Sequence, residues 1–91
     1  MPLILRILKP KDGKLWIKVG HHADDGRRGA LTVVIGDNEV ISDRKIALYF
    51  DVPRVEISPV PADGAVYRVV ATLKTDQDPP KKSTRNFIFP N

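Results

Sequence analysis

Apolar and polar side chains alternate along most of this chain, in short runs of five to eleven residues separated by polar or proline-containing breaks. Because a period of two places successive side chains on opposite faces of an extended chain, each run predicts a β-strand with one buried and one exposed face. In the longest run, Tyr67, Val69, Ala71 and Leu73 share one side. Seven strands are expected, over residues 3–9, 14–19, 30–35, 45–51, 54–58, 65–75 and 84–89.

The breaks between these runs carry residues that form tight turns. KPKDG, residues 9–13, ends in Asp-Gly and predicts a hairpin that joins the first two strands. The segment from Ile41 to Ile46 leaves room for one turn of helix, and no longer helical period is present. Short strands at this spacing predict an all-β fold with one domain over residues 1–91. The expected architecture is a small antiparallel β-sandwich of the immunoglobulin or fibronectin type III kind, and the alternative is a small barrel of the OB or SH3-like type.

One segment, PADGAVYRVVATL at residues 61–73, resembles the region before and along the penultimate strand of fibronectin type III and related immunoglobulin-like domains. In those domains a tyrosine follows a proline- or glycine-containing corner. The resemblance implies that Tyr67, three residues after Gly64, bonds through its hydroxyl to the chain upstream, and it favours the sandwich. The chain departs from the pattern at Pro61, where the family has leucine, and in carrying its tryptophan in the second expected strand instead of the third.

The composition is that of a soluble globular domain, with 42% hydrophobic and 29% charged residues. The absence of cysteine excludes disulfides, thiolate metal sites and cysteine nucleophiles, and it favours a reducing compartment. The N-terminal run MPLILRIL is too short to span a membrane, is interrupted by Arg6 and has no small-residue cleavage site. We therefore expect no signal peptide, no transmembrane segment and no membrane partner, and a cytoplasmic location or a place in an assembly is favoured.

The net charge of +4 is unevenly distributed along the chain. Residues 1–20 carry five basic residues and one acidic residue, whereas residues 21–43 carry two basic and five acidic residues. Such asymmetry indicates either an acidic partner or charge complementarity within the fold. The total charge is too small to require nucleic acid as the partner.

The stretch GHHADDGRRG, residues 20–29, has the composition of a metal or catalytic site. Zinc requires three or four converging ligands, yet His21 and His22 are the only histidines of a chain without cysteine. Calcium would need more oxygen ligands at alternate positions than Asp24 and Asp25 supply. No metal site is therefore expected, and a solvated hairpin loop is the favoured interpretation.

Within this loop, GRRG has the spelling of the GxxG loop with which KH domains clamp a nucleic-acid backbone. That loop joins two helices, whereas this one lies between two strand patterns, so a KH domain is not expected. The loop remains a candidate contact surface, formed by His21, His22, Arg27 and Arg28, and its histidines would make such a contact pH-dependent.

Catalytic patterns are weak. Ser42, Ser58 and Ser83 are the only serines, and none has the G-x-S-x-G context of a nucleophile elbow. Asp76 and Asp78 lie in the polar segment of residues 76–83, where solvent is expected to keep their carboxyl groups ordinary. We therefore expect a non-enzymatic protein without a cofactor.

The first hairpin carries the most suggestive surface. If Leu15 and its alternate neighbours face the core, Lys14, Trp16 and Lys18 share the opposite face, and Arg6 joins them from the paired strand. A tryptophan framed by cations is a common platform for single-stranded nucleic acid, because bases stack on the ring while the cations neutralise phosphate. It is equally compatible with a cap over the core, where lysine stems cover the ring, or with an anchor at a protein interface.

These patterns favour a non-enzymatic β-sandwich that binds protein or self-associates. Such a module would be a small subunit or accessory domain of a larger assembly, for example of virion or secretion type. The alternative is a small barrel that binds single-stranded nucleic acid. The candidate binding residues are Arg6, Lys14, Trp16, Lys18, His21, His22, Arg27 and Arg28.

Overall fold

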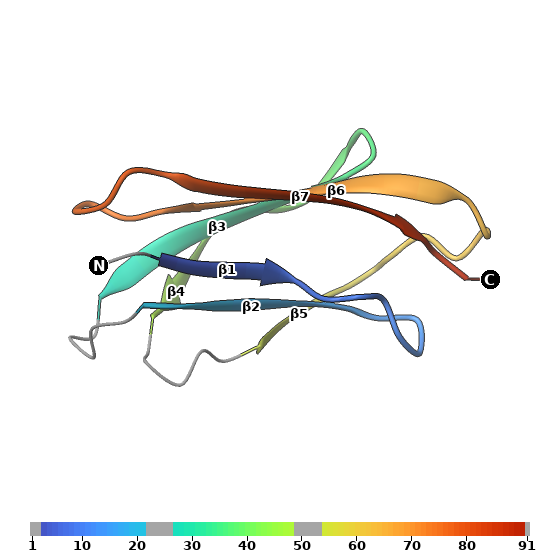
Figure 1. Ribbon diagram of the computed structural model, residues 1–91, viewed down its shortest axis with the longest axis horizontal. Helices are drawn as coiled ribbons and strands as arrows, with labels where there is room; N and C mark the ends of the chain where they lie inside the picture. The colour runs from blue at the N-terminus through green and yellow to red at the C-terminus, as the bar shows by residue number, and fades with distance from the viewer. Residues whose placement is uncertain (1–2, 22–26, 49–53, 91) are drawn as a thin grey trace.

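The computed structural model describes residues 3–21, 27–48 and 54–90 of the chain, and these segments form two facing antiparallel β-sheets (Figure 1). Strands β1, β2 and β5 form the small sheet in the order β1-β2-β5, and β4, β3, β6 and β7 form the large sheet in the order β4-β3-β6-β7. The bounds are β1 Leu3–Ile7, β2 Leu15–His21, β3 Arg28–Ile35, β4 Asn38–Ala47, β5 Arg54–Ile57, β6 Val66–Lys74 and β7 Lys81–Ile88.

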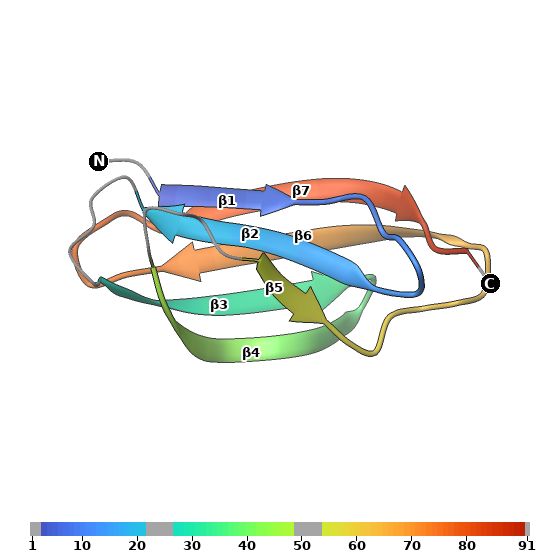
Figure 2. The same cartoon turned by 90° about the horizontal axis from the view of Figure 1, so that it is seen from below.

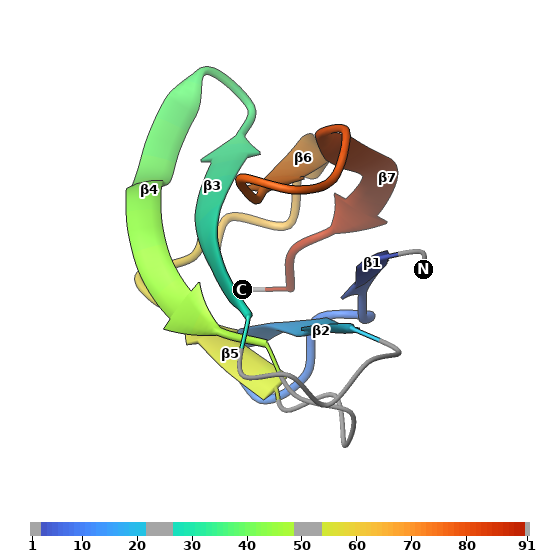
Figure 3. The same cartoon turned by 90° about the vertical axis from the view of Figure 1, so that its left-hand side faces the viewer.

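The predicted seven-stranded sandwich is confirmed, and the barrel alternative is not, because the strands form two separate sheets (Figures 2 and 3). The expected faces are confirmed as well: Val69, Ala71 and Leu73 of β6 are buried, and Tyr67 packs against them from the edge of the core. In the small sheet, Leu15, Ile17 and Val19 of β2 are buried as the alternation predicts. No helix in the described part of the chain is long and apolar enough to cross a membrane.

The turn between β1 and β2 follows from its two central residues. Asp12 and Gly13 both have positive φ, 55° and 73°, which is the backbone signature of the type I′ turn that matches strand twist. Lys11 and Lys14 exchange backbone N–H···O bonds of 3.0 Å across this turn. The hairpin predicted from KPKDG is therefore present, and it sets the register in which Arg6 lies opposite Lys18.

The prediction was wrong about the extent of β4. The strand covers Asn38–Ala47, so the polar residues before Lys45 are extended and the suggested helical turn at Ile41 to Ile46 does not form. β4 is an edge strand whose side chains are largely exposed, so burial imposes no alternation on its sequence. Its pairing with β3 also shifts register, and Asp43 there has a φ of 46°. The expected residues 49–51 lie outside the described residues.

Three other strands extend beyond their predicted bounds. β2 continues to His21 and β3 begins at Arg28, so part of the expected loop is strand. β7 begins at Lys81, within the segment expected to be a polar loop, because Lys81 and Lys82 pair with the end of β6. A cationic edge strand of this kind has no apolar alternation at its start, and its charges oppose edge-to-edge aggregation.

The corner before β6 has the bond that the resemblance implies. The Tyr67 hydroxyl donates to Asp63 Oδ2 at 2.6 Å, so the bond goes upstream to an acidic side chain. This hydrogen bond, followed by that from the Ala65 amide, holds the pKa of the Asp63 carboxyl below its ordinary value. The Tyr67 ring meets Phe89 edge to face at 5.7 Å, and the Gly64 amide donates to the Phe89 carbonyl at 2.8 Å. The corner is thus fastened to the end of the chain.

Candidate binding face

The outer face of the small sheet carries most of the predicted binding residues. Strand alternation buries Leu5 and Ile17 against the large sheet, so their neighbours in sequence point outward. The pairings of β1 with β2 and of β2 with β5 place these outward residues in rows across the three strands. We refer to this surface as the outer face; its main side chains are Ile4, Arg6, Trp16, Lys18, Arg54 and Glu56.

Three cations stand in one row of the outer face. Arg6 lies opposite Lys18 in the β1–β2 register, and Lys18 lies opposite Arg54 in the β2–β5 register. Among the described residues, none of the three forms an ion pair with an acidic side chain. Like charges directly opposite one another in a sheet are destabilising, so folding stability does not favour this cation row. The row is therefore a candidate for a binding role.

The sequence patterns predicted Arg6 and Lys18 as binding residues but did not identify Arg54, the third member of the cation row. Its position two residues before Glu56 in a short alternating run indicates that both share a face. What the sequence does not contain is the sheet order that places β5 beside β2. The exposure of Arg54 could be predicted from the sequence, but its position opposite Lys18 could not.

The row beside the cations contains the tryptophan. Trp16 is half-buried and lies opposite Glu56, and Lys14 Nζ lies 5.9 Å from the centroid of the Trp16 ring. Lys14 also forms a 3.1 Å ion pair with Glu56. The expected grouping of Lys14, Trp16, Lys18 and Arg6 on one face is therefore present in the structure. Glu56, which the sequence reasoning missed, adds a negative charge beside the ring.

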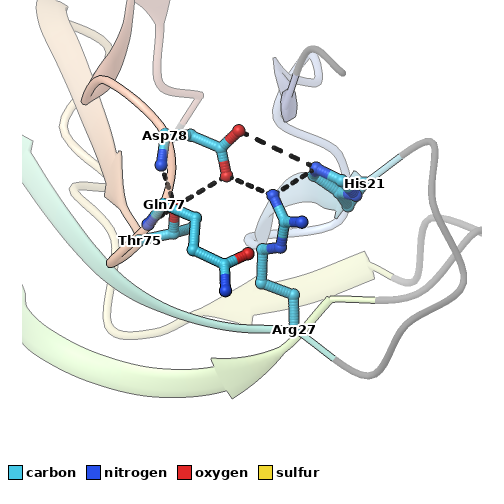
Figure 4. Close-up of polar contacts among 5 residues, drawn as sticks. All are labelled: His21, Arg27, Thr75, Gln77 and Asp78. Carbon is cyan, nitrogen blue, oxygen red and sulfur yellow. Dashed lines mark hydrogen bonds and ion pairs between the residues drawn. The ribbon is translucent and has the colours of Figure 1, made fainter.

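Two of the remaining candidate residues, His21 and Arg27, belong to a separate group at one end of the sandwich (Figure 4). Arg27 donates from Nη1 to Asp78 Oδ2 at 2.6 Å and to His21 Nε2 at 2.9 Å. Thr75 Oγ1 donates to the same Asp78 oxygen at 2.8 Å, and the Asp78 amide donates back to Thr75 Oγ1 at 2.9 Å. We call His21, Arg27, Thr75 and Asp78 the polar clamp, because they connect the ends of β2, β3 and β6.

The polar clamp corrects the expectation for His21. Its side chain is fully buried at the end of β2, so it does not form part of an exposed loop and cannot contact a partner directly. Since a guanidinium has no acceptor, His21 Nε2 accepts the bond from Arg27, and the same nitrogen lies 3.9 Å from Asp78 Oδ1. Arg27 is partly buried and Arg28 is exposed at the start of β3. His22 lies outside the described residues.

Asp78 also differs from its expectation of an ordinary, solvated carboxyl group. Its side chain is only 12% exposed. The hydrogen bond from Thr75, followed by the hydrogen bond and charge of Arg27, holds the pKa of the Asp78 carboxyl below its ordinary value, although burial opposes this shift. The signal in the sequence was the Thr75-x-x-Asp78 spacing, which allows a local side chain to backbone turn. Its pairing with Arg27 has no local signal.

The polar clamp has the composition of a structural group and not of a metal centre. Nε2 of His21 faces the Arg27 guanidinium, which would repel a cation at that position. Within residues 3–21, 27–48 and 54–90, no group of three or more His, Cys, Asp or Glu residues is placed to hold a metal ion. Asp24 and Asp25 lie outside the described residues.

Away from the polar clamp, the described residues line a cleft and a smaller groove. A cleft of about 560 Å³ lies beside the turn between β3 and β4 and is lined by Ile35, Asp37, Val40, Val60 and Tyr67 among others. A smaller groove of about 280 Å³ lies between β1 and β7, at the edge of the outer face. Comparison of the chain with models of protein families, with curated proteins and with solved structures found no match.

Proposed function

We propose that this protein is a non-enzymatic binding module whose outer face recognises an acidic segment of a protein partner. The observation that carries the proposal is the cation row Arg6–Lys18–Arg54, three in-register cations that no acidic side chain of the described residues neutralises. An acidic segment lying across the three strands would replace the mutual repulsion of these cations by attraction. Such a module would work as a small subunit or accessory domain of a larger assembly.

The surroundings of Trp16 favour a protein partner over nucleic acid. Glu56 lies opposite Trp16 and would repel a phosphate chain at the place where bases would stack on the ring. Ile4 and Leu8 of the β1 side are half-buried apolar residues next to the cations. A mixture of one aromatic ring, apolar side chains and Arg or Lys residues is typical of protein interfaces.

Fluorescence of Trp16, the only tryptophan of the chain, provides the test. The protein is titrated with a short all-glutamate peptide and, separately, with an oligothymidylate of the same charge. We expect the glutamate peptide to bind more tightly, with an affinity that falls as salt is added because the contacts are between exposed charges. Lys18→Gln is expected to weaken this binding several-fold, since it removes the centre of the row.

Arg68→Gln is the matched control, because Arg68 is an exposed cation of the large sheet that lies opposite the neutral Asn86. This variant has the same net charge as Lys18→Gln and is expected to bind like the parent protein. Equal effects of the two substitutions would show that only net charge matters and would overturn the proposal. Tighter, Lys18-dependent binding of the oligothymidylate would replace it by the nucleic-acid function.

A further inference from the structure

β1 ends the small sheet and has one backbone edge that does not face β2. The Leu8 amide donates to the Trp16 carbonyl at 3.0 Å, so the even-numbered residues of this hairpin direct their backbone groups toward β2. Because such groups alternate along an antiparallel strand, those of Leu5 and Ile7 point to the opposite edge. Arg85 of β7 confirms this direction, since its Nη1 donates to the Ile7 carbonyl at 3.1 Å.

This second edge of β1 pairs with no strand among the described residues, and we call it the free edge. Its Ile7 carbonyl accepts the bond from Arg85 and keeps a second lone pair for an added strand. The free edge opens onto the groove of about 280 Å³. β1 and β7 lie next to each other where the two sheets end, on the same side of the sandwich (Figures 2 and 3). The groove is therefore bounded by a backbone edge on one side and by side chains of β7 on the other. Its lining residues are Leu5, Arg6, Ile7, Leu8, Ser83 and Arg85.

The charge of the groove is of one sign. Arg6 and Arg85 are its charged lining residues, and both are cations. Lys81 and Lys82 continue the positive charge along the start of β7. Arg6 is also the end of the cation row, so a strand added beside β1 would place a side chain directly opposite Arg6. An acidic side chain at that position would complete the row with an attractive cross-strand pair.

We propose that the groove takes an extended acidic peptide strand, which pairs antiparallel with the free edge of β1 and alternates apolar and acidic residues. Its apolar side chains cover Leu5 and Ile7 at the groove, and its acidic side chains lie on the outer face opposite Arg6. This inference rests on the proposed function and specifies how the acidic partner binds. It is the strand-addition mode of peptide recognition, in which backbone bonds give affinity and alternate side chains give specificity.

A second copy of this chain is a less suitable occupant. Pairing two β1 strands about a two-fold axis, with the faces of the sheets kept continuous, brings the Arg6 side chains of both copies close together. The cation rows of the two copies would then meet end to end, with like charges facing each other. An acidic strand from another protein avoids this repulsion.

The experiment uses the intact protein and a capped peptide of four Val-Glu repeats. In antiparallel addition the valines lie opposite Leu5 and Ile7, so the valine N–H groups face β1 while the glutamate N–H groups face solvent. We compare two peptides of the same composition, one N-methylated at valine and the other at glutamate. They differ only in whether the methyl group replaces an N–H that faces β1 or one that faces solvent. We expect N-methylation at valine to reduce the affinity about tenfold or more, and N-methylation at glutamate to change it little.

Amide hydrogen exchange provides the second measurement. Binding of the unmethylated peptide should slow exchange at Leu5 and Ile7, whose N–H groups it would engage, and leave the already bonded Leu8 amide unchanged. A charge-reversed peptide of Val-Lys repeats should not compete.

The failures of the two proposals are distinguishable. If both N-methylated peptides bind like the parent peptide and their binding is still weakened by Lys18→Gln, the outer face binds acid but strand addition is wrong. If N-methylation at glutamate weakens binding and N-methylation at valine does not, antiparallel pairing with β1 is wrong. If the Val-Glu peptide does not bind while the all-glutamate peptide binds with dependence on Lys18, strand addition alone is wrong. If neither peptide shows binding that depends on Lys18, both proposals are wrong.

Discussion

If the cation row serves binding and not folding, removing its central charge should stabilise the fold. Lys18 has a like charge opposite it on each side, Arg6 in β1 and Arg54 in β5. Replacing Lys18 by glutamine keeps much of the aliphatic stem and removes both repulsions. We therefore expect Lys18→Gln to increase the free energy of unfolding while it weakens binding of an acidic partner.

The magnitude follows from the geometry of the row. Two unit charges about 7 Å apart in water repel by about 0.6 kcal/mol, and measured cross-strand pairs fall in a range of about 0.2–1 kcal/mol. Two such pairs give a gain of about 0.5–1.5 kcal/mol at low salt. With an unfolding entropy of about 2 cal/mol/K per residue, this corresponds to an increase in melting temperature of roughly 3–8 °C for a chain of this length.

Urea denaturation followed by circular dichroism measures this gain at about 20 mM and about 1 M salt, since the Debye length falls to about 3 Å at the higher concentration. The gain should be present at low salt and largely absent at high salt. Arg68→Gln, which faces the neutral Asn86, should show little gain at either concentration. The reasoning is refuted if Lys18→Gln is no more stable than the parent at low salt, or if its gain persists at high salt.

Three further predictions concern the elements that hold the sandwich together. Gly13→Ala should destabilise the fold by about 1–2 kcal/mol in thermal unfolding because φ is +73° there, although nothing lies within 4 Å of the added methyl; unchanged stability would contradict the turn assignment. Gly29→Ala should lower the free energy of unfolding by about 1–3 kcal/mol, because its methyl would lie 3.0 Å from the Leu73 side chain and 3.1 Å from the Lys74 carbonyl oxygen. Unchanged stability in urea titrations would show that the core adjusts to the methyl. Asp78 has a lowered pKa in the folded state, so its stabilising contribution is complete above the unfolded pKa of about 3.9 and is lost as pH falls through the folded value. Asp78→Asn should therefore flatten the acid side of the stability–pH curve, whereas Asp76→Asn, in the same loop but exposed, should not; an unchanged acid limb in Asp78→Asn would disprove the assignment.

The elements that could be predicted from sequence are those whose burial imposes a pattern. β2 and β6 lie inside their sheets, and their alternate residues are buried, so the period of two was visible in both. β4 and the start of β7 are exposed edge segments, and their polar sequences were interpreted as turn or loop. The pattern of a strand is informative only where one of its faces must leave water.

The same reasoning explains the outcome for the candidate site. Lys14, Trp16 and Lys18 belong to one strand, so their common face followed from alternation alone, and the Asp-Gly turn brought Arg6 opposite Lys18. His21 was misplaced because a histidine beside polar residues is ordinarily solvated. Its burial depends on Arg27 and on Asp78, which lies 51 residues from Arg27 in sequence.

The sequence by itself determined the strands with a buried face, the first hairpin, the inward and outward faces of those strands and the positive charge of the outer face, because these depend on neighbours a few residues apart. Only the tertiary structure decided that β5 lies beside β2, that Arg54 extends the pair Arg6–Lys18 into a row, and that Arg85 reaches the free edge of β1. Contacts between distant segments are selected by how two sheets pack around a shared core. No local pattern encodes that choice.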